Sequence, residues 1–525
     1  MRTPCDDVVI RSGKESAPCT QAHQPWILAA TILGSSMAFI DGTVVNVALP
    51  VLQSTFHATI VDVQWVVESY GLLLSSLILA GGALGDLFGR RRVFMIGVGI
   101  FAVASAACGL ASSVLELIIA RSLQGVGAAL LVPGSLAIIG ATFDKKSRGK
   151  AIGTWSGATA ITTALGPVVG GWLIEHGSWR WAFYLNLPLA VAVVAISLWR
   201  VPESRGSKGL HVDWLGALLA TSGLGGLVTG FLESTKLRWG NPLVFGSLAG
   251  GLACLVLFVR VEMKSVAPMV PLELFKSRSF LGANLVTLFL YAAIGVFFFL
   301  FPMELIRLEG YSTTAAGAAA LPMILLLFLL SRWSGGLINR YGARAPLIVG
   351  PLVVAIGFIL IAVIPKGVGY WKTFFPAFVV LGLGMAVTVA PLTTVVMSSV
   401  DAKHVGAASG VNNAVARVAG VLSIAVLGIV MVKAFGSRLE QTLKNLSIPQ
   451  DIAQDFRSKE IELASLELPP GLDPSVTAAI RQAISDAFRS GFHLVLLSCG
   501  GLSATSALVA WKLIASGTEI RRDQL

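Results

Sequence analysis

Charged side chains are scarce in this sequence. Only 13% of its 525 residues are charged, whereas 55% are hydrophobic. Because a soluble domain carries roughly 25% charged residues, no water-facing surface could enclose this much Leu, Val, Ala and Gly. Lipid must therefore be the solvent for most of the chain, and the lipid bilayer is an expected partner.

The residue patterns of common catalytic and metal sites are also missing. The five cysteines form no CxxC pair and the six histidines form no HExxH pair. Neither a P-loop nor a GxGxxG pattern is present, so ATP is not indicated as an energy source. We therefore expect a protein that is not an enzyme and has no metal site, disulfide or cofactor.

Positive charge is in excess, with a net charge of +11. This excess could indicate nucleic-acid binding, but the basic residues fall in short loops between apolar runs. Alternate loops are rich in Lys and Arg, whereas the opposite short loops hold almost none. This positive-inside bias predicts that both termini are cytoplasmic and that nucleic acid is not a partner.

Continuous apolar runs of spanning length number about fourteen, and each is close to the roughly 20 residues that a helix needs to cross the hydrocarbon. A membrane barrel would instead show alternating segments of about ten residues. We therefore predict an all-α integral membrane protein. The expected spans are 27–50, 62–84, 93–112, 115–140, 151–174, 181–200, 212–232, 242–261, 281–305, 313–331, 345–365, 372–398, 405–435 and 490–514.

An internal repeat divides the chain. Residues 81–92 read GGALGDLFGRRR and residues 335–344 read GGLINRYGAR. Such repeats indicate a transporter of two related halves. We expect a cytoplasmic tail at 1–26, a six-helix half at 27–200, two inserted helices with flanking loops at 201–280, a second six-helix half at 281–514, and a cytoplasmic tail at 515–525.

One long segment, 436–489, does not have spanning composition and is expected outside the membrane. Asp473-Pro474 is a good helix start, and apolar residues then recur every four positions. We predict an amphipathic helix over 474–489, lying on the outer surface or against the bundle. It could be a passive connector or could cap a gate.

Three ionisable residues lie inside predicted spans at similar depth. Arg121 is roughly 9 Å and Asp41 roughly 13 Å below the outer end of its helix, and Glu68 is about six residues into the second helix. A buried Arg keeps its charge and needs a partner. An exchange of partners by a nearby carboxylate would couple its protonation to movement, whereas a static ion pair would only tighten the bundle. Glu68 could be a second proton site, a contact for a cationic substrate, or simply water-facing.

Several motifs resemble those of the major facilitator superfamily, in particular its fourteen-helix drug:proton antiporter branch. They are IDGTVVNVALP (40–50), GALGDLFGRRR (82–92), LIIARSLQGVGAA (117–129), LGPVVGGWL (165–173), WRWAFYLNLP (179–188) and a segment near 391–420. The resemblance implies two six-helix halves with two helices inserted between them. It also ties Asp41 and Arg121 to proton coupling.

The loop motif contributes a predicted conformational latch, formed by Gly82, Asp86, Gly89, Arg90, Arg91 and Asp144. Gly89 permits a tight turn, and the arginines can reach a carboxylate at a neighbouring helix end, for which Asp144 is the expected target. Asp86 could face the helix N-terminus near Val405. The alternative is that these basic residues only determine topology.

The antiporter motif comprises Gly166, Pro167, Gly170 and Gly171. Proline kinks a helix, and small residues would let a helix of the other half approach closely. The resemblance links this motif to antiport, with generic helix packing as the alternative. The substrate cavity is expected to use Asn46, Tyr70, Trp155, Asn412, Asn413 and Arg417, although membrane aromatics more often face lipid.

The sequence thus predicts a proton-driven antiporter that exports small, amphipathic or drug-like molecules by alternating access, with the proton gradient as its energy source. A dedicated exporter of one metabolite, such as a siderophore, antibiotic or amino acid, is the alternative. We expect a multi-pass monomer in the cytoplasmic (inner) membrane. A periplasmic adaptor would be an added partner in a Gram-negative host.

Overall fold

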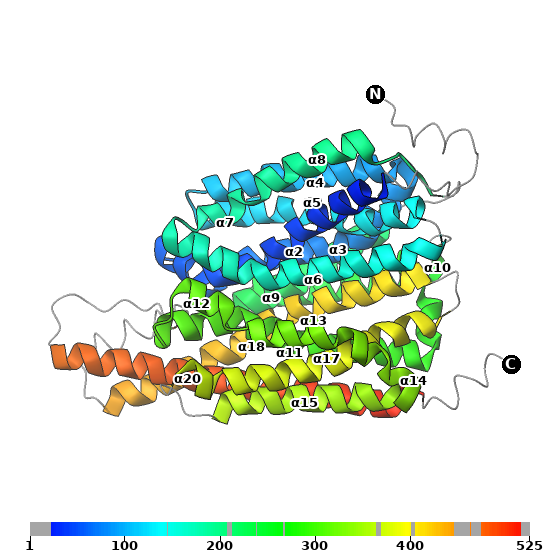
Figure 1. Cartoon of the computed structure of the whole chain (residues 1–525). Coiled ribbons are helices and arrows are strands. Elements are labelled where there is room, and N and C mark those ends of the chain that lie inside the picture. The colour runs from blue at the N-terminus through cyan, green and yellow to red at the C-terminus, as the bar shows by residue number, and fades with distance from the viewer. Residues whose placement is uncertain are drawn as a thin grey trace. The chain divides into compact units, whose positions relative to one another are not determined.

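The structure of the chain is a computed structural model. It describes residues 23–143, 145–206, 213–237, 239–265, 268–363, 369–400, 405–445, 463 and 474–515. Within these ranges, fourteen helices are long and apolar enough to cross a membrane (Figure 1). This confirms the predicted all-α membrane fold, and most helix limits lie within a few residues of the apolar runs.

The first eight spans are formed by the helices up to residue 264. They are α2 (Gln24–Thr55), α3 (Ile60–Phe88), α4 (Arg90–Leu110), α5 (Val114–Thr142), α6 (Lys145–His176), α7 (Arg180–Tyr184) with α8 (Asn186–Arg200), α9 (Trp214–Lys236) and α10 (Pro242–Lys264).

The later spans begin after a short 3₁₀ helix, η1 (Leu272–Lys276). The six later spans are formed by α11 (Arg278–Met303) with the π-helix η2 (Glu304–Leu308), α12 (Thr313–Ala318) with α13 (Leu321–Gly335), α15 (Arg344–Val363), α17 (Phe375–Ser398), α18 (Val405–Asn445) and α20 (Pro474–Leu513). The short helices α14 (Leu337–Tyr341) and α16 (Tyr370–Thr373) precede α15 and α17.

Serine side chains begin three of these helices. Ser113 accepts a hydrogen bond from the amide of Glu116 in α5, Ser277 from that of Phe280 in α11, and Ser312 from that of Ala315 in α12. Each serine satisfies an amide that has no partner within its own helix. Capping therefore fixes where these three helices start.

The chain forms two compact units. Unit 1 comprises residues 1–48, 66–225 and 251–271, and unit 2 comprises 49–65, 226–250 and 272–525. The boundaries fall inside α2, α3, α9 and α10, so each of these four helices supplies residues to both units.

Unit 1 is held together by close helix contacts at small residues. A Cβ on Gly127 of α5 would lie 2.6 Å from the backbone nitrogen of Phe101, and a Cβ on Gly97 of α4 would lie 2.8 Å from Leu131 N. Helix α4 also packs against α7 and α8. Small residues are what allow membrane helices to pack at such short range.

Unit 2 has a buried aromatic core. Phe297 of α11 is fully buried and contacts Phe301, Phe358 of α15, Phe378 of α17 and Phe492 of α20, with ring centroids 4.9 to 6.5 Å apart. Helix α15 packs on α17 and α20, α13 on α17, and α11 on α18 and α20. Aromatic side chains therefore join four helices of this unit.

The prediction for residues 474–489 was wrong in one respect. The helix does begin at Pro474, and its residues Ile480, Ile484 and Phe488 are buried. It does not form a separate surface element, because α20 continues without interruption to Leu513 (orange to red in Figure 1). The only helix breaker near the junction is Gly491, which packs closely on Met431 of α18 instead of ending the helix.

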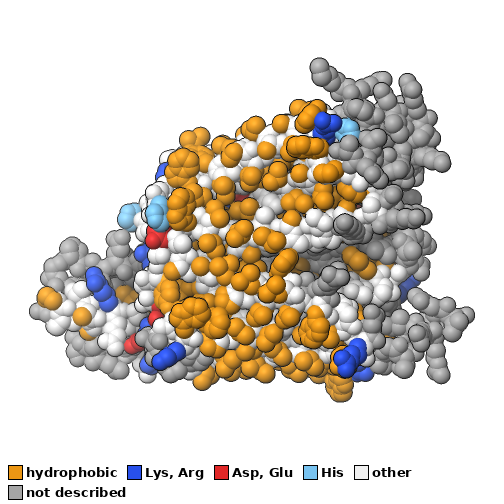
Figure 2. All heavy atoms as spheres, in the orientation of Figure 1, with side chains coloured by type: hydrophobic (Ala, Val, Ile, Leu, Met, Phe, Trp, Pro, Cys, Tyr) orange, Lys and Arg blue, Asp and Glu red, His pale blue; other side chains and the backbone are white. Residues whose placement is uncertain are grey.

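The outer surfaces of the helices are apolar. Large side chains such as Val103, Val191 and Leu329 are 72, 70 and 69% exposed. Figure 2 shows hydrophobic side chains over the visible helix surfaces, with charged side chains near helix ends. Such a surface requires a lipid solvent, which agrees with the composition.

Candidate proton-coupling site

Asp41 of α2 and Arg121 of α5 form an ion pair inside unit 1. An oxygen of the Asp41 carboxylate, Oδ2, accepts from Nη1 of Arg121, and both side chains are only 1% exposed. The pairing expected from their similar depths is present in the structure. A charge pair withdrawn from water this completely needs further hydrogen bonds to be stable.

Two buried amides supply those hydrogen bonds. Gln124 donates from Nε2 to Asp41 Oδ1 over 2.8 Å and accepts from Arg121 Nη1 over 2.7 Å. Asn186 of α8 donates from Nδ2 to Asp41 Oδ1 over 3.2 Å and to Ser105 Oγ over 3.0 Å. Helices α5 and α8 therefore contact the carboxylate of α2 directly, and α4 is joined to them through Ser105.

The remaining face of Arg121 is also occupied by α3. Its Nε donates to the carbonyl oxygen of Val66 over 3.2 Å, and its guanidinium carbon lies 4.2 Å from the ring centre of Tyr70. The Tyr70 hydroxyl donates to Ala38 O over 3.1 Å. Arg121 thus keeps a carbonyl, an amide and a ring as partners even when the charge of Asp41 is removed.

Sequence reasoning did not single out Gln124 or Asn186. Both stand in motif segments that were recognised, three residues after Arg121 and within WRWAFYLNLP. A search for charges overlooks uncharged amides. The sequence signal that could have identified them is that Gln and Asn are uncommon in apolar helices and, when buried, usually have a hydrogen-bond partner.

Glu68 of α3 is buried in a different way. It is fully buried, and neither carboxylate oxygen has a hydrogen-bond partner among the described residues. No ion pair joins it to Arg121. An isolated buried carboxylate is costly when charged. The surroundings of Glu68 therefore favour a neutral carboxyl group or the binding of a cation beside it.

The glycines of the antiporter motif pack against α2, next to Asp41. A Cβ on Gly166 would lie 2.2 Å from Thr43 Oγ1, and one on Gly170 would lie 2.6 Å from Val44 Cγ1. The sequence predicts that these glycines contact a helix of the other half. In the structure they contact α2 instead, and both helices belong to unit 1 at these positions. Because these glycines have no Cβ atom, α6 can pack directly against α2, the helix that carries Asp41.

Polar contacts extend this α2–α6 interface. Thr162 donates to Ser36 Oγ over 3.1 Å, and Trp155 donates to Ser35 Oγ over 3.1 Å. Helix α6 runs through Pro167 without ending. The interface therefore combines close backbone approach at the motif with hydrogen bonds on its N-terminal side.

The loop motif surrounds the start of α4. Asp86 pairs with Arg90 over 2.8 Å, and Gly89 has a φ of +113°, which a residue with a Cβ rarely adopts. Asp144, the expected target of the arginines, lies outside the described residues. Glu203, which sequence reasoning missed, accepts from the amides of Arg91 and Arg92 over 3.1 and 3.2 Å.

Glu203 also explains why residue 89 is glycine. A Cβ there would lie 2.7 Å from Glu203 Oε1. The carboxylate takes the position at the first turn of α4 where an anion is favoured by the helix dipole. Its side-chain pairs with Arg91 and Arg92 are longer, at 3.9 and 3.7 Å.

The predicted cavity residues divide between the two units. Asn46, Tyr70 and Trp155 belong to unit 1, and Asn412, Asn413 and Arg417 belong to unit 2. Tyr70 and Trp155 are only 6 and 8% exposed, with their polar atoms hydrogen-bonded. Asn412 donates to Thr287 over 2.7 Å, and Asn413 donates to Ser409 of its own helix over 3.0 Å.

Comparison with known proteins decides the family. The model of the Major Facilitator Superfamily matches residues 31–424. The chain belongs to the Major Facilitator Superfamily. It is therefore a multi-pass membrane protein of a transporter family, and Asp41 and Arg121 lie inside two of the fourteen spans found among the described residues.

Relatives within the Major Facilitator Superfamily include named export and resistance proteins. The Tetracenomycin C resistance and export protein of Streptomyces glaucescens is 31% identical over 93% of this chain and 91% of its own length. The Multidrug resistance protein Stp of Mycobacterium tuberculosis is 34% identical over 81% of this chain and 79% of its own length.

Solved structures agree on the fold. An inward-facing, occupied bacterial homologue of the human lysosomal transporter Spinster superposes with a TM-score of 0.65 at 17% identity, covering 96% of this chain and 99% of its own. At that identity the likeness shows the major facilitator fold alone.

Proposed function

We propose that the protein is a proton-driven antiporter that exports small amphipathic or drug-like molecules by alternating access. The observation that carries this proposal is the Asp41–Arg121 pair, which is 1% exposed and whose hydrogen bonds join α2, α3, α5 and α8 of unit 1. An ionisable pair inside a membrane bundle is a functional candidate because it is too costly for a passive contact.

The contacts suggest how proton binding would act. Arg121 cannot readily lose its charge, so Asp41 is the member of the pair that takes up a proton. A proton on Asp41 removes the attraction between the two side chains. Arg121 then keeps Gln124, Val66 O and the Tyr70 ring. The hold of α2 on α5 weakens, and the proton controls how strongly the two helices are joined.

Helix α6 would transmit this change. Gly166 and Gly170 hold α6 against the stretch of α2 that carries Asp41. A shift of α2 after protonation must therefore move α6 or separate the two. Inward movement of one proton down its gradient would in this way be coupled to outward release of substrate.

The proposed setting follows from the loop charges and the family. We place the protein in the cytoplasmic membrane with both termini inside, acting as a monomer without a cofactor. The Stp relative, named a multidrug resistance protein, supports a broad substrate range.

A second candidate is a dedicated exporter of one compound. The relative named for tetracenomycin C resistance and export supports it, because that name specifies a single antibiotic. Both candidates use the same proton site and differ only in the breadth of the substrate cavity.

Substrate-induced proton release from detergent-purified protein tests the proposal. We expect several lipophilic cations each to release protons from the parent and none to do so from Asp41→Asn. The Asn side chain keeps an acceptor oxygen for Arg121, so this variant should still fold and bind substrate. Glu273→Gln is the matched control, since Glu273 is 78% exposed.

Each outcome has a defined meaning. Release with a single compound would favour the dedicated exporter. Substrate binding without proton release in the parent would overturn antiport. Unchanged release in Asp41→Asn would remove Asp41 from the mechanism.

A further inference from the structure

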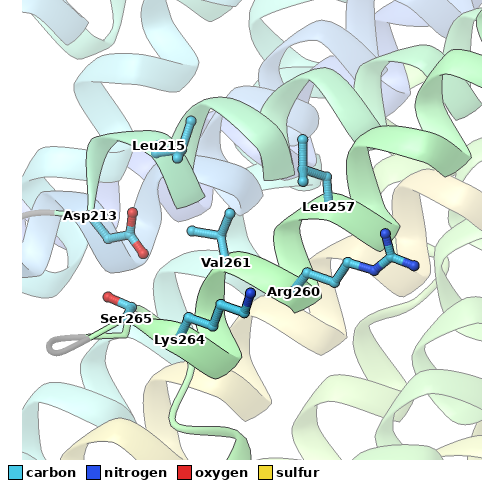
Figure 3. Close-up of a pocket in the computed structure, with 7 residues that line it drawn as sticks. All are labelled: Asp213, Leu215, Leu257, Arg260, Val261, Lys264 and Ser265. Carbon is cyan, nitrogen blue, oxygen red and sulfur yellow. The ribbon is translucent and has the colours of Figure 1, made fainter.

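A cavity of about 410 Å³ lies between the first turn of α9 and the last turns of α10, within unit 1 (Figure 3). It is separate from the Asp41 site and belongs to the two inserted helices. Its lining comprises Asp213, Leu215, Leu257, Arg260, Val261, Lys264 and Ser265.

Two of the three charged side chains that line this cavity are cations. Arg260 and Lys264 are four residues apart on α10, so they lie one above the other on the same helix face. Both are exposed, and among the described residues neither forms an ion pair. Two cations on one wall of a cavity favour an anionic ligand.

Asp213 does not neutralise these cations. It lies on the other side of Val261 from Arg260 in Figure 3. Its Oδ1 accepts from Gly216 N over 2.7 Å and so caps α9, and its Oδ2 is buried. A Cβ on Gly216 would lie 2.7 Å from Asp213 Oδ2 and 3.0 Å from Glu262 Oε1. The carboxylate therefore faces inward, toward Glu262.

Apart from the hydroxyl of Ser265, the uncharged part of the lining is apolar. Leu215, Leu257 and Val261 form the wall between the charged residues. The neighbouring surface of α10 is apolar and open, with Leu252 58% and Met263 64% exposed. An acyl chain could lie along this surface while a phosphate occupies the cationic end.

We propose that this cavity binds the phosphate group of an anionic phospholipid headgroup. The proposal rests on the orientation given above, which places the C-terminal end of α10 at the cytoplasmic leaflet. Basic pockets between helices at that leaflet are known to hold anionic headgroups. Free inorganic phosphate shares the chemistry of the headgroup but makes no use of the apolar surface, so the lipid is the favoured source.

The test uses the full chain purified in detergent, with phosphatidylglycerol, phosphatidylcholine or inorganic phosphate added separately. Thermal unfolding and native mass spectrometry report binding. We expect phosphatidylglycerol to bind the parent and raise its unfolding temperature more than the other two. Arg260→Gln/Lys264→Gln should bind phosphatidylglycerol about thirtyfold more weakly, from the loss of two cations near the membrane surface.

Lys276→Gln/Arg278→Gln is the matched control. It removes two exposed cations from the same predicted side of the membrane, outside the cavity. Equal loss of binding in this control would overturn the proposal by showing a general charge effect. Inorganic phosphate that stabilises as strongly as the lipid would overturn the lipid assignment, and unchanged lipid binding by the cavity variant would overturn the site.

Discussion

At the scale of single residues, the main feature is the way Asp41 is satisfied. Its two oxygens accept from one guanidinium and two amides, and its side chain is 1% exposed. The depth of Asp41 and Arg121 along their helices was enough to predict the pairing. The amides could not be placed from the sequence, because their role depends on which helix faces α2.

Removal of the cation should be costly. In Arg121→Gln the Asp41 charge stays buried without its counter-ion, and we expect a loss of about 3–5 kcal/mol in the free energy of unfolding at neutral pH. Denaturant unfolding of purified protein at neutral pH measures this loss.

The double variant Asp41→Asn/Arg121→Gln supplies the control. With both charges gone, most of the lost stability should return, because the two changes are strongly coupled. An Arg121→Gln protein as stable as the parent would show that the pair is energetically unimportant.

Substitution of Glu68 should have the opposite effect on stability from substitution of Arg121. Since it has no hydrogen-bond partner among the described residues, Glu68→Gln removes only the cost of a buried acid. We expect an unchanged or higher unfolding temperature. If Glu68 carries a second proton, fewer protons should be released per substrate. The measurement is the number of protons released per bound substrate molecule. An unchanged number in Glu68→Gln would exclude this role.

At the scale of elements, the antiporter motif is a contact between α2 and α6. The sequence indicated a close approach at Gly166 and Gly170, since small residues permit it. It could not indicate the partner, because many helices offer an apolar face of similar shape. Thr43 and Val44, which fill the space left by the glycines, are unremarkable residues when viewed in the sequence alone.

This contact can be tested within one helix. Gly166→Ala should cost about 1–3 kcal/mol by overpacking against Thr43, and should impair transport because α6 is pushed away from α2. Gly153, on the same helix, has open space at its Cβ position. Gly153→Ala should therefore be neutral or stabilise by up to about 1 kcal/mol. Equal effects of the two changes in unfolding and transport assays would contradict this account.

The helix ends were harder to predict than the spans. Hydropathy placed fourteen helices and Asp473-Pro474 indicated the helix start at Pro474, but neither showed that α20 is continuous to Leu513 or that α18 continues to Asn445. These extensions are amphipathic, and they are stabilised by tertiary contacts such as those of the buried Leu439 and Phe488. Composition alone does not reveal whether such a segment continues a helix or bends away from it.

At the scale of the whole molecule, the two compact units do not follow the chain halves. Residues 49–65 and 226–250 belong to unit 2 although they lie in the first part of the sequence. Within unit 2 they are joined by the Asp62–Lys236 pair at 2.8 Å and by the Trp65–Glu233 hydrogen bond at 3.2 Å. The internal repeat predicted two halves but carried no information on these shared helices.

Shared helices predict cooperative unfolding. Neither unit can lose its structure without disrupting α2, α3, α9 and α10, which also belong to the other. We expect one calorimetric transition in detergent. Single-tryptophan variants that retain Trp155 in unit 1 or Trp511 in unit 2 should unfold at the same temperature. Two separated transitions would show independent units.

The lengths of α18 and α20 have a practical consequence for imaging. With 41 and 40 residues, each is about 60 Å long, roughly twice the hydrocarbon thickness of a bilayer. The two helices pack against each other in unit 2. A rigid soluble protein fused in place of residues 446–473 would be held by two continuous helices. It would give a small membrane protein the external mass that particle alignment in electron microscopy requires.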